Sequence, residues 1–393
     1  MNIKLLNIKY TIVQSIYCVL ICVVVGYASV YLLDREVNNA IIGLVLSLGN
    51  IFAVILQQYL ATLIDTYESI TLKKIVIILT SSLILFSSGV LFLNSITFLL
   101  LLFVVIVITL LNTLQPFFNS LAFEYEAVNI TINFGLARGL GSLSYAITSL
   151  LLGNILSQIG MSVVPVLYVG LSILLFIVSY FFKSPPIEKN SDNLKEEVTK
   201  TKLLEFFKEN KMFLVMLLAT ILLFYDQNII NSFFIQIINN VGGDSSHLGV
   251  AMFLAAAVEL PIMMLYQKIN RRVSCKTLIL VASLFFSIKH AITYLAPNIE
   301  MLYMAQLLQS LAFALFLPTS VYIVKELVAS KDLIRGQALF TGAITISGVL
   351  ASFTGGILLD MLGVSNTLLV GLIISICGTL LMFINLKMDR QTN

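Results

Sequence analysis

Long apolar runs follow one another along nearly the whole of this chain. A helix needs about 20 consecutive apolar residues to cross the hydrocarbon core of a bilayer. The 393 residues contain twelve runs of roughly this length. We therefore predict an all-α integral membrane protein with twelve transmembrane helices, near residues 10–33, 40–64, 75–95, 97–123, 134–158, 162–183, 212–239, 247–269, 277–296, 298–325, 337–361 and 365–386.

The composition supports this class and excludes others. Apolar residues make up 59% of the chain and charged residues 11%, whereas about 25% of a typical soluble domain is charged. No basic stripe is interleaved with aromatic residues, so we expect no nucleic-acid partner. The four cysteines imply no disulfide framework. The acidic residues are too few and too scattered for a metal site, and no catalytic motif occurs, so we expect no cofactor and no enzyme activity.

One long polar segment divides the chain. It lies between the sixth and seventh runs and carries many lysines and acids. We predict an N-terminal six-helix bundle, a cytoplasmic linker and a C-terminal six-helix bundle, over residues 1–183, 184–211 and 212–393.

The basic residues orient the chain. With both termini in the cytoplasm, every Lys and Arg falls at a cytoplasmic end or loop except Arg35, Arg138 and Lys289. This asymmetry follows the positive-inside rule. We predict a multi-pass protein of the plasma membrane with both ends cytoplasmic, and we expect a monomer.

The two halves resemble each other at one place. LLGNILSQIG at 151–160 ends the fifth run and FTGGILLDMLG at 353–363 ends the eleventh, each with a glycine seven residues before the closing glycine. Such a repeat is expected of two pseudo-symmetric bundles related by an axis along the membrane normal.

Twelve runs, a central linker and this repeat resemble the major facilitator superfamily of transporters. Its loop between the second and third spans is present in degenerate form: Asp65, Lys73 and Lys74 are in place, while Ala61 and Thr66 replace a glycine and a basic residue. The resemblance implies a conformational gating loop there. Six stretches are similar to the oligosaccharide:proton symporter branch, typified by lactose permease: LQQYLATLID at 56–65, FGLARGLGSLSY at 134–145, FYDQ at 224–227, VEL at 258–260, SIKH at 287–290 and QLLQSLAFALFL at 306–317.

Arg138 is the first candidate for function because it lies within an apolar run. An arginine near the middle of a membrane helix costs about 3 kcal/mol or more to insert, so it normally faces a polar cavity or a partner. Gly135 and Gly139 beside it form a G-x-x-x-G pair, which predicts close approach of another helix. The alternative is that Arg138 snorkels to the headgroups.

Three further ionisable residues besides His290 lie well inside runs, namely Asp226, Glu259 and Lys289. Together with Arg138 they give two positive and two negative charges, which can pair and so lower the cost of burial. Glu259 and Asp226 are the candidates for proton coupling, with a structural ion pair as the alternative for each. His290 is interpreted as a packing group.

The resemblance implies roles for three residues of the set. Arg138 matches the sugar-binding arginine of the branch, and Glu259 matches its carboxylate that contacts sugar hydroxyls and takes part in proton coupling. Tyr145 stands where lactose permease carries an aromatic residue that stacks on the sugar ring.

The chain also departs from that branch. Lys289 replaces an arginine, Gln309 a histidine and Ala312 a glutamate that is deprotonated during transport, and Asn119 stands where an acidic sugar ligand is expected. We retain Lys289, Gln309 and Asn119 as candidate substrate-binding residues, together with Tyr225, which begins a polar stripe on the seventh run. Further amides share helical faces and indicate either a polar cavity or interhelical hydrogen bonds: Gln14, Asn50, Gln57, Asn112, Gln115 and Gln306.

These observations predict a secondary transporter. It moves a small hydroxylated solute, a sugar or oligosaccharide, by alternating access as a proton symporter, with sodium as the other candidate ion. Its expected partners are that solute, the coupling ion and the lipid bilayer. The alternative is an exporter of amphipathic compounds or drugs by proton antiport, which the apolar composition and the missing glutamate leave open. A non-transporting sensor with the same fold would show no flux.

Overall fold

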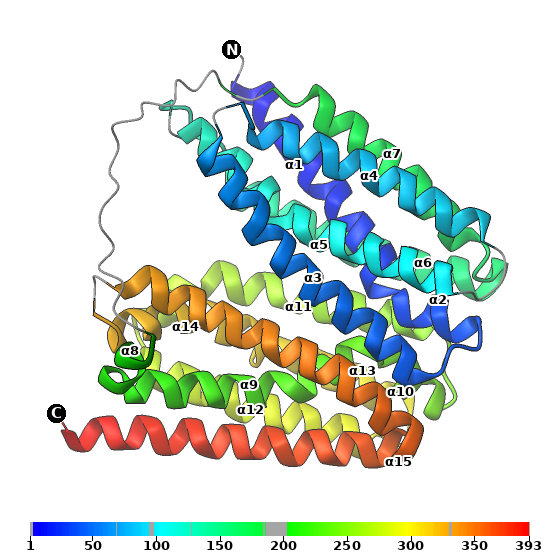
Figure 1. Cartoon of the computed structure of the whole chain (residues 1–393). Helices are drawn as coiled ribbons and strands as arrows, with labels where there is room; N and C mark the ends of the chain where they lie inside the picture. The colour runs from blue at the N-terminus through cyan, green and yellow to red at the C-terminus, as the bar shows by residue number, and fades with distance from the viewer. Residues whose placement is uncertain are drawn as a thin grey trace. The chain divides into compact units, whose positions relative to one another are not determined.

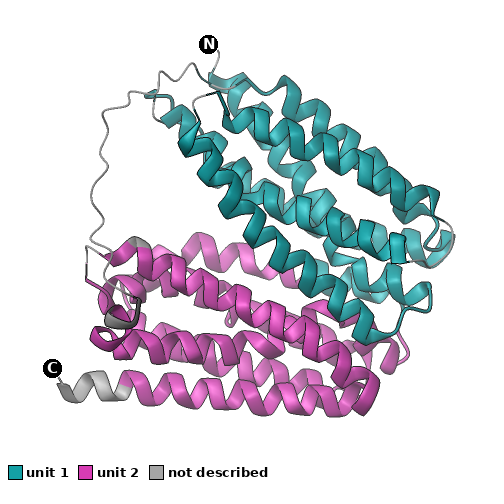
Figure 2. Cartoon of the chain, in the orientation of Figure 1, with its two compact units in different colours: residues 1–191, 244–253 teal, residues 192–243, 254–393 magenta. Residues whose placement is uncertain are grey.

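The computed structural model describes residues 3–67, 69–93, 98–126, 128–183, 185, 203–329 and 332–392. The regular elements within these ranges are all helices. The chain divides into two compact units (Figure 2): unit 1 is Met1–Ser191 with Asp244–Phe253, and unit 2 is Asp192–Gly243 with Leu254–Asn393. Most of the predicted linker lies outside the described residues, so the domain boundaries drawn from the sequence stay a prediction.

Unit 1 contains the first six spans (Figure 1). Within it, α1 packs against α6 and α7, while α5 packs against α3 and α4. Its elements are α1 (Ile3–Ile21), η1 (Cys22–Gly26), α2 (Ala28–Asp34), α3 (Asn39–Thr66), α4 (Leu72–Phe92), α5 (Phe98–Glu126), α6 (Phe134–Ile159), α7 (Val163–Phe181) and the first turns of α11 (Ser245–Asn270).

Unit 2 holds the remaining spans (Figure 1). Here α9 and α12 both pack along α15, and α12 also packs against α14. Besides the rest of α11, its elements are α8 (Leu203–Glu209), α9 (Lys211–Ser232), α10 (Phe234–Asn240), α12 (Cys275–Leu295), α13 (Ile299–Leu307), η2 (Leu308–Ser310), α14 (Phe313–Leu327) and α15 (Leu333–Thr392).

Eleven helical segments of the described chain are long and apolar enough to cross a membrane. One of them, Arg335–Leu386, has 52 residues, and Gly363 interrupts its helical geometry with φ 75° and ψ 177°. Because a span needs only about 20 residues, this segment contains two spans. The prediction of an all-α membrane protein with twelve spans is therefore confirmed.

Short polar residues start several of these helices. A side-chain oxygen at the N-cap accepts a hydrogen bond from a backbone N–H of the first turn, which has no partner within the helix. The caps of this kind are Asn38 for α3, Thr71 for α4, Asn133 for α6, Ser274 for α12 and Asn298 for α13.

Asp244 does the same before α11. Its carboxylate accepts from the backbone N–H groups of Ser246 and His247, at 3.0 and 3.2 Å, and from the Ser246 hydroxyl at 2.7 Å. Partial burial opposes ionisation of this carboxyl, but the hydrogen bonds from Ser246 and His247 together outweigh it and lower the pKa of Asp244. The cap is therefore in its charged form at neutral pH.

The sequence repeat marks the same backbone turn in both units. Gly160, between α6 and α7, has φ 86° and ψ −179°, and Gly363 has nearly the same values. This region of the Ramachandran plot is essentially restricted to glycine. The closing glycines of segments 151–160 and 353–363 thus turn the chain from one span to the next.

The first and seventh spans, which occupy corresponding places in the two halves, are both interrupted. The first passes through the π-helical turn η1 to Tyr27, with φ −109° and ψ 11°. The seventh is interrupted at Phe233, between α9 and α10, with φ −124° and ψ 29°. Such irregular turns inside a span often accompany functional sites.

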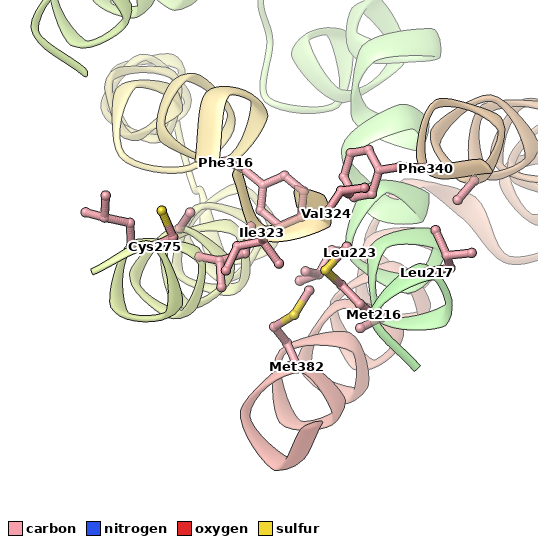
Figure 3. Close-up of a cluster of buried hydrophobic side chains, with 14 of the residues drawn as sticks. Met216, Leu217, Leu223, Cys275, Phe316, Ile323, Val324, Phe340 and Met382 are labelled. Atoms are coloured by element: carbon pink, nitrogen blue, oxygen red, sulfur yellow. The ribbon is translucent and has the colours of Figure 1, made fainter. Parts of the chain in front are cut away.

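A cluster of buried apolar side chains lies in the interior of unit 2. Figure 3 shows side chains from α9, α12, α14 and α15 converging, among them Leu223, Phe316, Val324, Phe340 and Met382. Inside a bilayer such contacts stabilise a bundle mainly by close packing, because lipid tails are as apolar as the side chains. The cluster helps to fix the positions of α9, which carries the buried Asp226 and Gln227, and of α12, which carries the buried Lys289 and His290.

The expected close approach at Gly135 and Gly139 is wrong for the described residues. Nothing lies within 4 Å of a Cβ placed at Gly139, and the nearest atom to one at Gly135 is 4.0 Å away. Tight contacts lie farther along α6, at Gly141, where a Cβ would lie 2.9 Å from Cys18 Sγ and 3.4 Å from the Gln14 carbonyl oxygen of α1, and at Gly153. At Gly153 a Cβ would lie 2.5 Å from the Ser245 carbonyl oxygen and 2.9 Å from the Cα of Gly249.

We predict that Gly363→Ala destabilises the protein by about 1–3 kcal/mol, because alanine is strained at this φ and ψ. Thermal unfolding of the purified protein in detergent measures the effect. Gly342→Ala is the matched control, since Gly342 is helical with open space around its Cβ. Equal unfolding midpoints for the two variants would contradict the prediction.

Candidate functional site

Lys289 on α12 is fully buried in the interior of unit 2. Its Nζ donates hydrogen bonds to the side-chain oxygens of Gln227 on α9, at 3.0 Å, and of Gln309 in η2. An ammonium group withdrawn from water is costly unless acceptors replace the water. The two amide oxygens do this here.

Gln309 joins this lysine to Glu259. Its Nε2 donates to Glu259 Oε1 at 3.0 Å, while its Oε1 accepts from Lys289. Lys289 and Glu259 therefore interact across the amide, at longer range, and not through a direct ion pair. The pairing of buried charges expected from the sequence takes an indirect form for Lys289 and Glu259, because the neutral Gln309 amide bonds to both charged groups.

The chain of hydrogen bonds continues in the other direction. Gln227 Nε2 donates to Asn231 Oδ1 at 3.0 Å, one turn farther along α9. Asn231 is exposed and Glu259 is partly exposed, whereas Gln227, Lys289 and Gln309 are buried. A continuous chain of hydrogen bonds thus links the exposed Asn231 to the partly exposed Glu259 through buried residues of unit 2.

A break in the tenth span positions Gln309. Helix α13 ends at Leu307, the 3-10 turn η2 follows, and Ala312 has φ −84° and ψ −90° before α14 begins. Interrupted membrane helices free backbone and side-chain groups for binding, and many transporter sites are built on them. Gln309 lies within the interruption.

A second polar group lies beside the first. His290 Nδ1 is 3.2 Å from Asp226 Oδ2 and 2.8 Å from the hydroxyl oxygen of Ser375 on α15. The Asp226 and His290 side chains are at most 1% exposed. Adjacent residues on a helix point about 100° apart. Asp226 and Gln227 therefore enter different networks, as do Lys289 and His290.

In unit 1 the candidates lie on α5 and α6. Arg138 is half-buried and lies close enough to Tyr10, Tyr17 and Cys18 of α1 to act on them electrostatically. The Tyr145 hydroxyl is 3.1 Å from a Cβ placed at Gly26, so Tyr145 lies beside the interruption of the first span.

Several predicted polar residues make hydrogen bonds between helices. Asn119 Oδ1 accepts from Gln14 at 3.3 Å, and Asn112 Nδ2 donates to Asn50 Oδ1 at 2.9 Å. Tyr225 is bonded to the Thr354 hydroxyl at 2.6 Å. These contacts match the interhelical alternative for the amides, and they tie Tyr225 to α15.

The predicted gating residues lie at the junction of α3 and α4. Asp65 is exposed near the end of α3. Lys74 Nζ donates to the Ser69 carbonyl at 2.7 Å, and Lys73 Nζ lies 6.0 Å from the centre of the Tyr180 ring.

Sequence reasoning missed two features of unit 2. It gave no role to Gln227 or Asn231, although their i, i+4 spacing places them on one helical face. It also separated Asp226 from His290, because no local spacing links residues on different helices.

The family of this chain follows from its sequence. The model of the MFS_1 like family matches residues 8–370, which is nearly the whole chain. The chain belongs to this family of major facilitator transporters. The superfamily predicted from twelve runs and the repeat is therefore confirmed, and this multi-pass transporter is not an enzyme.

Two curated relatives are similar to this transporter. The uncharacterized transporter YwbF of Bacillus subtilis (strain 168) is 23% identical over 375 residues, which covers 94% of this chain and 90% of the relative. The maltose permease of Geobacillus stearothermophilus is 26% identical over 294 residues, covering 74% and 73%. The second agrees with the predicted resemblance to sugar symporters.

Solved structures share the fold of this transporter. The nucleoside transporter NupG superposes with a TM-score of 0.82 at 17% identity, covering 99% of both chains. A bacterial homolog of the human lysosomal transporter Spinster gives 0.72 at 14% identity, covering 98% of this chain and 97% of the other. The transporter thus has the major facilitator fold.

We predict that Gln309→Leu destabilises the transporter by about 1–3 kcal/mol. It removes one acceptor from the buried Lys289 ammonium and the hydrogen bond to Glu259. Gln267→Leu, an equal change at an exposed position of α11, is the control in thermal unfolding. Adding Lys289→Met to Gln309→Leu should recover part of the loss, because an unpaired buried charge costs more than an apolar replacement. No loss in the single variant, or no recovery in the double, contradicts this account.

Proposed function

We propose that this transporter moves a small solute that carries a sugar ring, driven by protons. The observation that carries the proposal is the chain from Lys289 through Gln309 to Glu259, which presents a partly exposed carboxylate on a rigid polar support. A maltose permease among the relatives and a nucleoside transporter among the structures, both of which handle sugar-bearing solutes by name, support it.

The chemistry of the candidate residues suits hydroxyl groups. A hydroxyl both donates and accepts, so it binds well to carboxylates, guanidinium groups and amides. We assign solute hydroxyls to Glu259 and Arg138, and the apolar face of the sugar ring to Tyr145. Lys289, Gln309, Asn119 and Tyr225 complete the proposed binding set as supports or direct ligands.

Glu259 is the proposed carrier of the coupling proton. Among the described residues it accepts a hydrogen bond from the neutral Gln309 amide, so protonation breaks no direct ion pair. A bound hydroxyl that donates to the carboxylate favours one protonation state over the other, and such differential binding is what couples two events.

The surroundings of the site follow the same proposal. Asp65, Lys73 and Lys74 act in the conformational change that exposes the site to one side of the membrane at a time. From the distribution of basic residues we propose that both termini lie in the cytoplasm, and we propose that the transporter acts in the plasma membrane as a monomer.

We predict that saccharides or nucleosides stabilise the purified transporter and that Arg138→Ala abolishes this. A ligand at 100 times its Kd adds about 2.7 kcal/mol of apparent stability, which a thermal-shift assay detects. Arg271→Ala, at an exposed loop position, is the control. A response limited to lipophilic cations would favour the exporter of amphipathic compounds. A saccharide response that survives Arg138→Ala would move the site elsewhere.

We predict that Glu259→Gln stops uphill accumulation of the solute but preserves exchange across proteoliposome membranes. Glutamine keeps hydrogen bonds to hydroxyls and cannot release a proton. Glu209→Gln, at an exposed position of α8, should accumulate solute as the wild type does. Proton-driven accumulation by Glu259→Gln would exclude Glu259 as the carrier, and accumulation that follows a sodium gradient would replace the proton.

A further inference from the structure

Unit 2 buries one lysine between two carboxylates. Lys289 acts electrostatically on Glu259 through the Gln309 bridge and on Asp226 in the neighbouring network. In an apolar interior an uncompensated charge costs several kcal/mol. One positive lysine is therefore best balanced by one negative carboxylate, and a second negative charge is unfavourable.

The Asp226 carboxyl lies close enough to the His290 imidazole to share a proton with it. Oδ2 of Asp226 lies 3.2 Å from Nδ1 of His290, and both side chains are almost completely buried. A Cβ on Gly371 would lie 2.0 Å from Asp226 Oδ1, so α15 carries a glycine where the carboxyl needs room. The Phe286 ring, centred 5.8 Å from the imidazole, adds an apolar wall.

The groups that face this pair come from three helices. Helix α9 supplies Asp226, α12 supplies His290 and Lys289, and α15 supplies the neutral Ser375 and Gly371. Among the described residues, Lys289 is the charged group that acts on both members of the pair. Three buried atoms, both carboxyl oxygens of Asp226 and Nε2 of His290, have no hydrogen-bond partner among those residues, while His290 Nδ1 is hydrogen-bonded to the Ser375 hydroxyl.

We propose that Asp226 and His290 form a second proton-binding site, which is full when Glu259 is ionised and empties when Glu259 takes up a proton. In both states, one negative carboxylate then balances the positive charge of Lys289. The inference deepens the proposed proton coupling and rests on it for its role in transport. It gives the coupling proton a place of entry at Glu259 and a separate place of release.

The geometry of the pair limits where its protons can lie. The full pair carries two protons: one is on Asp226 Oδ2 or on His290 Nδ1, which lie 3.2 Å apart, and the other is on His290 Nε2. The empty pair keeps one proton, on Nδ1, which donates to the Ser375 hydroxyl oxygen and lies beside the ionised carboxylate. A bare Nδ1 would set its lone pair against that carboxylate at 3.2 Å. The proton that is released leaves His290 Nε2, so the protonation state of this nitrogen reports the release.

Nitrogen NMR of the histidines tests this. The chain has two histidines, so ¹⁵N-histidine labelling yields two sets of signals, and His247→Gln assigns them. At neutral pH we expect Nε2 of His290 to be protonated in the wild type and bare in Glu259→Gln, where Asp226 alone balances Lys289. It should be protonated again in Glu259→Gln with Lys289→Met. Glu209→Gln, an exposed carboxylate on α8, should match the wild type.

Two results overturn the proposal: a bare Nε2 in the wild type, or the same Nε2 state in the wild type and Glu259→Gln. Glu259→Ala makes the same change of charge with a different shape, and it replaces Glu259→Gln if that variant does not fold. The measurement needs neither solute nor flux. If Nε2 responds and no proton-driven transport is found, the proposed function fails alone. If transport is proton-driven and Nε2 does not respond, the second site fails alone.

Discussion

The burial of one ammonium group organises the polar interior of unit 2. Lys289 has no exposed surface, and its charge is met by the amide oxygens of Gln227 and Gln309. Gln309 reaches it because the tenth span is broken at η2, and its other end holds Glu259. Had Glu259 paired directly with the lysine, its carboxylate would be committed to that contact. With an amide between them, the carboxylate still interacts electrostatically with the positive charge. It also keeps the capacity to bind a hydroxyl or a proton.

Interruptions of the helical backbone lie beside some of the candidate residues. The first, seventh and tenth spans all contain interruptions, at Tyr27, Phe233 and Ala312, and the candidate residues Tyr145 and Gln309 lie beside two of them. In the hydrocarbon region such interruptions are tolerated where protein surrounds them. The apolar cluster of unit 2, part of which Figure 3 shows, includes Ala312 and so supplies that surrounding for the interruption of the tenth span.

Membership in the major facilitator superfamily fixes the fold of this chain more firmly than its chemistry. The maltose permease and the nucleoside transporter share low identity with it, and fold alone does not specify a substrate. The proposed function therefore depends on particular groups: a carboxylate held by an amide, a half-buried arginine, and an aspartate paired with a histidine. Each of these is a residue whose burial is costly without a partner or a task.

The sequence by itself determined the class of the molecule, its twelve spans, its family and the repeat that contains Gly160 and Gly363. Those features depend on run length and on local backbone preference, which a single chain displays. It also located Arg138, Asp226, Glu259 and Lys289 as charged residues within the spans. Only the tertiary structure decided their partners. Helices far apart in sequence meet at Gln309 and at His290, and neighbours on one helix diverge by about 100° into separate networks. Contacts between distant segments leave no periodic signal, so the Gln309 bridge and the Asp226–His290 pair became visible only once the helices were packed.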